Sequence, residues 1–90
     1  MDIIWDNDKD NELRALRGIS FEDVVRVIRA KRYDSILEHP SHPDQMIFIV
    51  LLVGLIHVVP FFLDANDNIV LKTIFRSTIF QDLFDATGTP

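Results

Sequence analysis

The chain has 90 residues, 48% of them hydrophobic, which is enough for one core and too few for two domains. It contains no cysteine, which excludes disulfide bonds and thiolate metal sites. The net charge of −5 argues against tight nucleic-acid binding by the chain as a whole, because contact with phosphates depends on clustered Lys and Arg.

The first third of the chain predicts a short strand and two helices. Residues 2–5 have the apolar character of an opening strand, and Asp6 is a candidate N-cap for a helix that ends at Gly18. This helix is expected to bury Leu13 and Leu16. Ser20 then caps a second helix. Its apolar residues recur at i, i+3, i+4 and i+7, at Phe21, Val24, Val25 and Ile28.

Strands dominate the middle of the chain. Residues 35–38 predict a brief strand, and the loop that follows contains Pro40 and Pro43, which exclude a regular helix. The apolar run 46–63 is long enough for a membrane helix. Gly54 interrupts it, however, and Ile, Val and Phe prevail, so a β-hairpin that turns near Val53 and Gly54 is the better interpretation.

The last third predicts a turn at 64–68, a strand over Ile69–Phe75 and a short helix over Ser77–Phe84, with a frayed tail at 86–90. The elements together predict one α+β domain over residues 1–90, in which two N-terminal helices pack on a small antiparallel sheet. Because the first residues have neither the basic nor the apolar part of a secretory signal, we expect a cytoplasmic protein that does not enter membranes.

The three histidines are candidates for chemistry. His39 and His42 stand three residues apart in the proline-containing loop, where a zinc site, proton transfer and an ordinary surface loop are all compatible with the pattern. With no cysteine and no defined third ligand, we assign no metal. His57 lies in an apolar strand, which favours a structural, hydrogen-bonded role.

Lys72 and Arg76 are the only basic residues after Arg32. Residues an even number apart in a strand project from one face, so the two cations could together hold a phosphate. A solvated strand end explains the same two residues.

Several short segments resemble the BrnT-type toxins of type II toxin-antitoxin systems. The opening of that family is similar to Trp5, Asp6 and Lys9, followed by Gly18, Ile19, Ser20 and Phe21. The resemblance continues through 36–40, 45–48, 59–61 and 71–74, so that it covers nearly the whole chain.

This resemblance implies a RelE-like ribonuclease fold and RNA cleavage that inhibits translation, with no cofactor. It also implies an antitoxin partner, often of the ribbon-helix-helix type. Metal-free cleavage needs proton carriers and cations for the phosphate. At positions that match the family, we expect the catalytic roles to fall to Glu38, His39, Lys72 and Arg76. Lys9, Arg26 and Arg29 are candidate RNA-binding residues, with weak affinity for RNA.

Two departures from the family pattern support an alternative function. Most of the basic cluster that follows the last strand is missing, and Leu13 and Arg17 stand where members carry Asn and His. The alternative is an inactive or repurposed member that binds an antitoxin or a second copy of itself. The unusually apolar hairpin end is its candidate interface, through Leu51, Leu52, Val53, Leu55 and Ile56.

Overall fold

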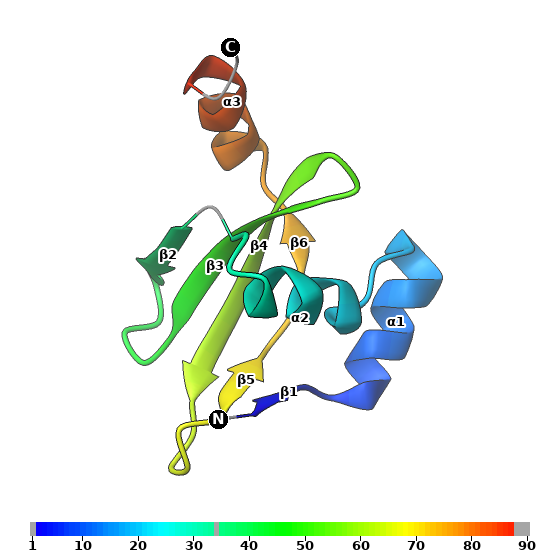
Figure 1. Ribbon diagram of the computed structural model, residues 1–90, viewed down its shortest axis with the longest axis vertical. Helices are drawn as coiled ribbons and strands as arrows, with labels where there is room; N and C mark the ends of the chain where they lie inside the picture. The colour runs from blue at the N-terminus through cyan, green and yellow to red at the C-terminus, as the bar shows by residue number, and fades with distance from the viewer. Residues whose placement is uncertain (1, 34, 88–90) are drawn as a thin grey trace.

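The computed structural model describes residues 2–33 and 35–87 and confirms the α+β class (Figure 1). In these residues, three helices accompany one six-stranded sheet. The elements in chain order are β1 (Ile3–Ile4), α1 (Asn7–Arg17), α2 (Phe21–Arg29), β2 (Ser35–Glu38), β3 (Met46–Leu52), β4 (Leu55–Leu63), β5 (Ile69–Leu71), β6 (Phe75–Arg76) and α3 (Thr78–Thr87).

The strands lie in the order β1-β5-β4-β3-β2, and β6 also pairs with β4. The sheet is antiparallel, as predicted, except at one edge, where β1 runs parallel to β5. Two hydrogen bonds fix this return of the N-terminal strand: Ile69 N donates to the Asp2 carbonyl (2.8 Å), and Asp2 N donates to Asn68 Oδ1 (3.0 Å). Within residues 2–33 and 35–87, none of the helices has both the length and the apolar character of a membrane-spanning segment.

The two N-terminal helices begin and end where their capping residues predict. The Asp6 side chain accepts from Asp8 N, and Gly18 ends α1 with a left-handed φ of 65°. Ser20 and Asp23 form a reciprocal capping box at the start of α2. The predicted burial of Leu16 is wrong, because α1 buries only a narrow stripe and leaves this side chain 74% exposed.

The sheet has a differently packed core on each face. On one face, α1 and α2 cover a large cluster that includes Phe21, Val24, Phe48, Val59 and Phe61. The rings of Phe48 and Phe61 stack there, with centroids 4.3 Å apart. On the other face lies a smaller cluster over β3 and β4, against which Phe80 of α3 packs.

The predicted single strand over Ile69–Phe75 is instead two strands separated by a bulge. Leu71 of β5 stands opposite Phe61, whereas Phe75 of β6 stands opposite Val58. Three residues, 72–74, therefore face only two residues of β4. One extra residue reverses which side chains point to which face. The end of the chain also differs from prediction: α3 continues through Ala86 and Thr87, and 88–90 lie outside the described residues.

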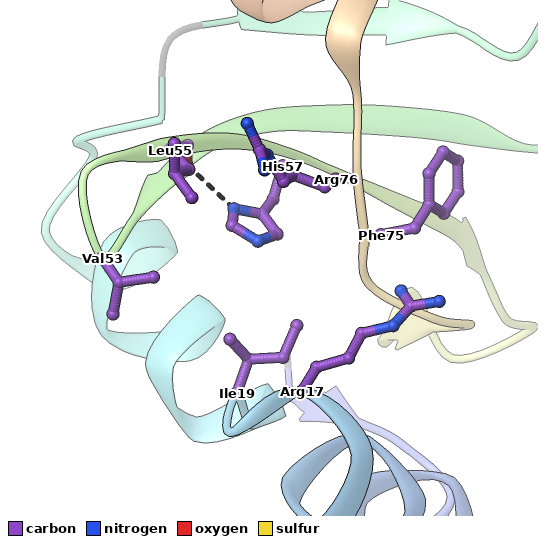
Figure 2. A pocket seen from close by; sticks show the side chains of 7 residues that line it. All are labelled: Arg17, Ile19, Val53, Leu55, His57, Phe75 and Arg76. Atoms are coloured by element: carbon purple, nitrogen blue, oxygen red, sulfur yellow. Dashed lines mark hydrogen bonds between the residues drawn. The ribbon is translucent and has the colours of Figure 1, made fainter.

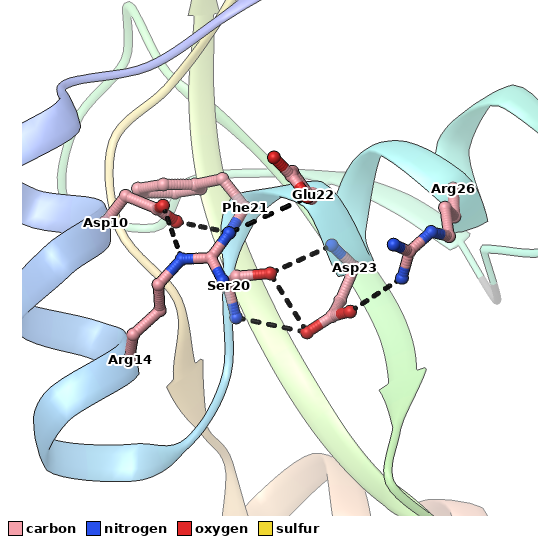
Figure 3. Close-up of polar contacts among 7 residues, drawn as sticks. All are labelled: Asp10, Arg14, Ser20, Phe21, Glu22, Asp23 and Arg26. Carbon is pink, nitrogen blue, oxygen red and sulfur yellow. Dashed lines mark hydrogen bonds and ion pairs between the residues drawn. The ribbon is translucent and has the colours of Figure 1, made fainter.

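A buried carboxylate connects α1 to α2 (Figure 3). Asp10 is 7% exposed and accepts hydrogen bonds from Phe21 N and from Arg14 Nε, both at 2.8 Å. Burial raises the pKa of the Asp10 carboxyl, but the hydrogen bonds from Arg14 and Phe21 and the charge of Arg14 together lower it below the ordinary value. The folded state therefore favours the ionised carboxylate.

We expect Asp10→Asn to lower the free energy of unfolding at pH 7 by about 1.5–3 kcal/mol, because hydrogen bonds to a charged group are lost. A pKa lowered by folding adds stability above the ordinary value of 3.8 and loses it as the pH falls through the folded-state pKa. The difference between the two proteins should therefore shrink on acidification below pH 4, as measured by urea unfolding. Exposed Asp82 provides the control, Asp82→Asn. A deficit that stays constant down to pH 2 would contradict the assigned role.

Candidate functional site

A pocket of about 380 Å³ opens on the helix-covered side of the sheet, beside the turn between β3 and β4 (Figure 2). It combines two arginines and a histidine with apolar walls, and among the residues that the structure describes no acidic one lines it. The lining residues are Arg17, Ile19, Val53, Leu55, His57, Phe75 and Arg76. They come from α1, the loop before α2, the hairpin and β6, so distant parts of the sequence build this one site.

Arg17 reaches the pocket from the last turn of α1. The left-handed Gly18 ends the helix directly after it, and the Arg17 Nη1 atom donates to the Ile74 carbonyl at 3.0 Å. This bond joins the first helix to the segment that leads into β6. One guanidinium is therefore held at the pocket wall while its other N–H groups can still donate.

His57 projects from β4 into the pocket and is 5% exposed (Figure 2). Its Nδ1 atom lies 2.8 Å from the Leu55 carbonyl oxygen. Because a carbonyl oxygen can only accept, Nδ1 carries the hydrogen, and in the neutral ring Nε2 is left with the lone pair. The backbone thus selects the tautomer in which Nε2 can accept a proton.

Arg76 stands directly opposite His57 in the β4–β6 pairing. Opposed residues of an antiparallel pair share a face, so the bulge brings Arg76 to the helix-covered side together with the imidazole. Two permanently charged guanidinium groups, Arg17 and Arg76, therefore border the pocket beside a potential base. Such a combination suits a phosphate ester that has a nearby hydroxyl to be deprotonated.

The four predicted catalytic residues do not form one site. Arg76 lines this pocket, whereas Glu38 and His39 line a second pocket on the other side of the sheet. Lys72 lies over the ring of Phe62, with Nζ 5.5 Å from its centroid. The prediction that Lys72 and Arg76 share a face is wrong because the bulge between them reverses the alternation.

The predicted RNA-binding residues lie on the helices, outside this pocket. Lys9 pairs with Glu12 at 3.6 Å on α1, and Arg26 pairs with Asp23 at 3.0 Å on α2, whose last residue is Arg29. In these two ion pairs, the carboxylates of Glu12 and Asp23 neutralise part of the positive charge of Lys9 and Arg26. Nothing in their placement joins these three residues to the pocket.

The predicted hairpin interface separates into buried and accessible residues. Leu52 and Ile56 belong to the chain's own core, at 6% and 1% exposed, which removes them from any partner surface. Leu55 lines the pocket. Leu51 and Val53 are 45% and 81% exposed, so the hairpin tip does present apolar groups to the surroundings.

Sequence reasoning missed Arg17 and His57. The signal for His57 was its position as a polar residue within the apolar run of β4, but this pattern also fits the structural role that the sequence predicts for it. Arg17 was visible only as a departure from the family pattern. No group of three or more His, Asp, Glu or Cys side chains suited to a metal ion occurs within residues 2–33 and 35–87.

No protein-family model, curated protein or solved structure matches the chain. The resemblance to BrnT-type toxins therefore stays a prediction.

The two sides of the sheet should contain histidines of opposite tautomer. His57 is expected as Nδ1–H because of the Leu55 carbonyl, whereas Nδ1 of His39 accepts from the backbone N–H groups of Ser41 (3.0 Å) and His42 (3.2 Å) and so leaves the hydrogen on Nε2. Long-range ¹H–¹⁵N correlation spectra, recorded at a pH where both imidazole rings are neutral, distinguish the two tautomers. Identical tautomers at both positions would contradict the hydrogen bonding described.

Proposed function

We propose that this protein is a metal-independent endoribonuclease, the toxin of a type II toxin-antitoxin pair in the cytoplasm, with its reaction centre at Arg17, His57 and Arg76. The observation that carries the proposal is the pocket in which two arginines flank a histidine whose Nε2 is the acceptor nitrogen. The resemblance in sequence adds the toxin and antitoxin roles, including a ribbon-helix-helix partner.

The proposed reaction is an intramolecular transesterification, in which the 2′-hydroxyl of a ribose attacks the phosphodiester that joins this ribose to the next nucleotide. Nε2 of His57 takes the proton of the 2′-hydroxyl, and the oxygen attacks the adjacent phosphorus while the bond to the 5′-oxygen breaks. Arg17 and Arg76 stabilise the additional negative charge of the pentacoordinate phosphorus. The leaving oxygen takes a proton from water, and the imidazolium of His57 returns its proton to the hydroxide that is left, so the products end in a 2′,3′-cyclic phosphate and a 5′-hydroxyl.

The charge distribution predicts weak and salt-sensitive RNA binding. The chain carries a net charge of −5, and only Arg17 and Arg76 bring positive charge to the pocket. Each cation that contacts a phosphate contributes to the dependence on salt, so two contacts give a shallow slope. Under this proposal, catalysis depends more on the positions of Arg17, His57 and Arg76 than on the affinity of the protein for RNA.

A second candidate function, self-association through the hairpin tip, is favoured by one observation. Val53 is 81% exposed and has a positive φ of 46°, followed by Gly54 at 77°. Positive φ at both central positions is the pattern of a type I′ turn, where Asn is common and a β-branched residue is strained. A strained, exposed valine beside Leu51 suits an apolar contact with a second copy of the chain.

Arg76→Gln should lower the rate of RNA cleavage by about 10²–10³-fold, because one donor to the transition-state charge is lost. The matched control is Lys72→Gln, which removes the same charge from the other side of the bulge and should leave the rate unchanged. The measurement is formation of cyclic-phosphate ends on a single-stranded RNA by the purified protein, together with growth on induction in cells.

Equal losses in the Arg76 and Lys72 variants would assign the effect to net charge instead of the pocket. An inactive wild-type protein that does not arrest growth would remove the ribonuclease proposal. Thermal unfolding of each variant verifies that the fold is intact.

Val53→Asn should raise the free energy of unfolding by about 1 kcal/mol, because Asn accepts positive φ more readily than valine. If the tip associates with a second copy, the same substitution should weaken dimerisation. Denaturation at low protein concentration measures the first effect and sedimentation over a concentration series the second. A wild-type chain that stays monomeric throughout the series would refute the interface.

A further inference from the structure

The second pocket lies on the opposite side of the sheet, between β2 and α3, and also measures about 380 Å³. Its character differs from that of the basic pocket, because most of its lining is apolar and none of it is arginine or lysine. The lining residues are Leu37, Glu38, His39, Pro40, Ile47, Val58, Phe75, Ser77 and Phe80.

Among the described residues, Phe75 alone lines both pockets. Successive strand residues point to opposite faces, so β6 presents the Arg76 side chain to one face and the phenyl ring of Phe75 to the other. The residues opposite them on β4 support this assignment of faces. Phe75 stands opposite Val58 of the smaller core, and Arg76 stands opposite His57. Figure 2 shows the phenyl ring turned away from the imidazole.

The two pockets meet at the short strand β6, which contributes Phe75 to both and Arg76 to the basic pocket. Within the described part of the sheet, β6 pairs with β4 alone, so no strand covers its other edge. A ligand bound to Arg76 therefore lies next to Phe75, the preceding residue, whose ring forms the aromatic wall of the second pocket.

The second pocket suits a flat ring that has polar edges. Ile47, Val58 and Phe80 supply apolar walls, and the ring of Phe75 is 39% exposed. His39 brings a donor, because two backbone N–H groups occupy its Nδ1 and leave the hydrogen on Nε2. The Ser77 hydroxyl is a further polar group at this pocket. An apolar cavity with a few placed polar groups is typical of sites for small aromatic ligands.

We propose that the second pocket is a nucleobase subsite, in which a base of the RNA strand stacks on Phe75 while a phosphate of the same strand lies at Arg17 and Arg76. The inference rests on the proposed function and specifies its substrate as single-stranded RNA, because a base within a duplex cannot leave its stack to enter the pocket without an energetic cost. Stacking tolerates any base, so this subsite adds affinity more than sequence preference.

Binding of two probes by Phe75 variants tests the subsite. The probes are a short 2′-O-methyl oligonucleotide, which resists cleavage, and an abasic oligomer of the same length and charge. Phe75→Leu keeps an apolar side chain but removes the ring, and should weaken binding of the oligonucleotide at least about fivefold. Binding of the abasic oligomer should not change, and Phe75→Trp should restore binding of the oligonucleotide.

Phe62→Leu is the matched control, because Phe62 lines neither pocket and lies beneath Lys72 instead. A wild-type protein that binds neither probe overturns the proposed function and the subsite together. A Phe75→Leu variant that binds both probes like the wild type overturns the subsite alone. Equal weakening for the two probes also overturns it, because Phe75 would then act through the phosphate site.

Discussion

The one extra residue between β5 and β6 determines the face of the sheet to which Arg76 points. Without it, Arg76 would continue the alternation of β5 and share a face with Lys72, away from His57. The bulge instead places Arg76 opposite His57 and leaves Lys72 over Phe62 on the other face. A single change of register thus separates two cations and pairs one of them with an imidazole.

The placement of Arg17 depends on a second constraint, the packing of α1 against α2. Asp10 is ionised, nearly buried and bound to the first backbone N–H of α2 at Phe21. It joins α1 to the start of α2, and Gly18 ends α1 directly after Arg17, whose guanidinium donates to the Ile74 carbonyl. The acidic N-terminal part of the chain thus contributes to the geometry of a basic pocket.

Local signals predicted most of the fold, and long-range register accounts for most of the errors. The caps at Asp6 and Ser20 and the hairpin turn at Gly54 are encoded within a few residues, so the helices and the hairpin were predictable. The parallel β1–β5 pair and the bulge depend on which distant segments meet, and no local pattern specifies that. Of the candidate catalytic residues, only Arg76 was anticipated at the pocket, because the face to which a strand residue points cannot be read across an unseen bulge.

The Arg17–Ile74 hydrogen bond also has a consequence for the order in which the molecule is made. A chain emerging from the ribosome exposes Arg17 first, whereas Ile74, which accepts its hydrogen bond, follows 57 residues later in the same segment as Arg76. Until that segment docks beside β4, the basic pocket has only one of its two guanidinium walls. The two guanidinium groups therefore come together only after both segments of the chain have been synthesised.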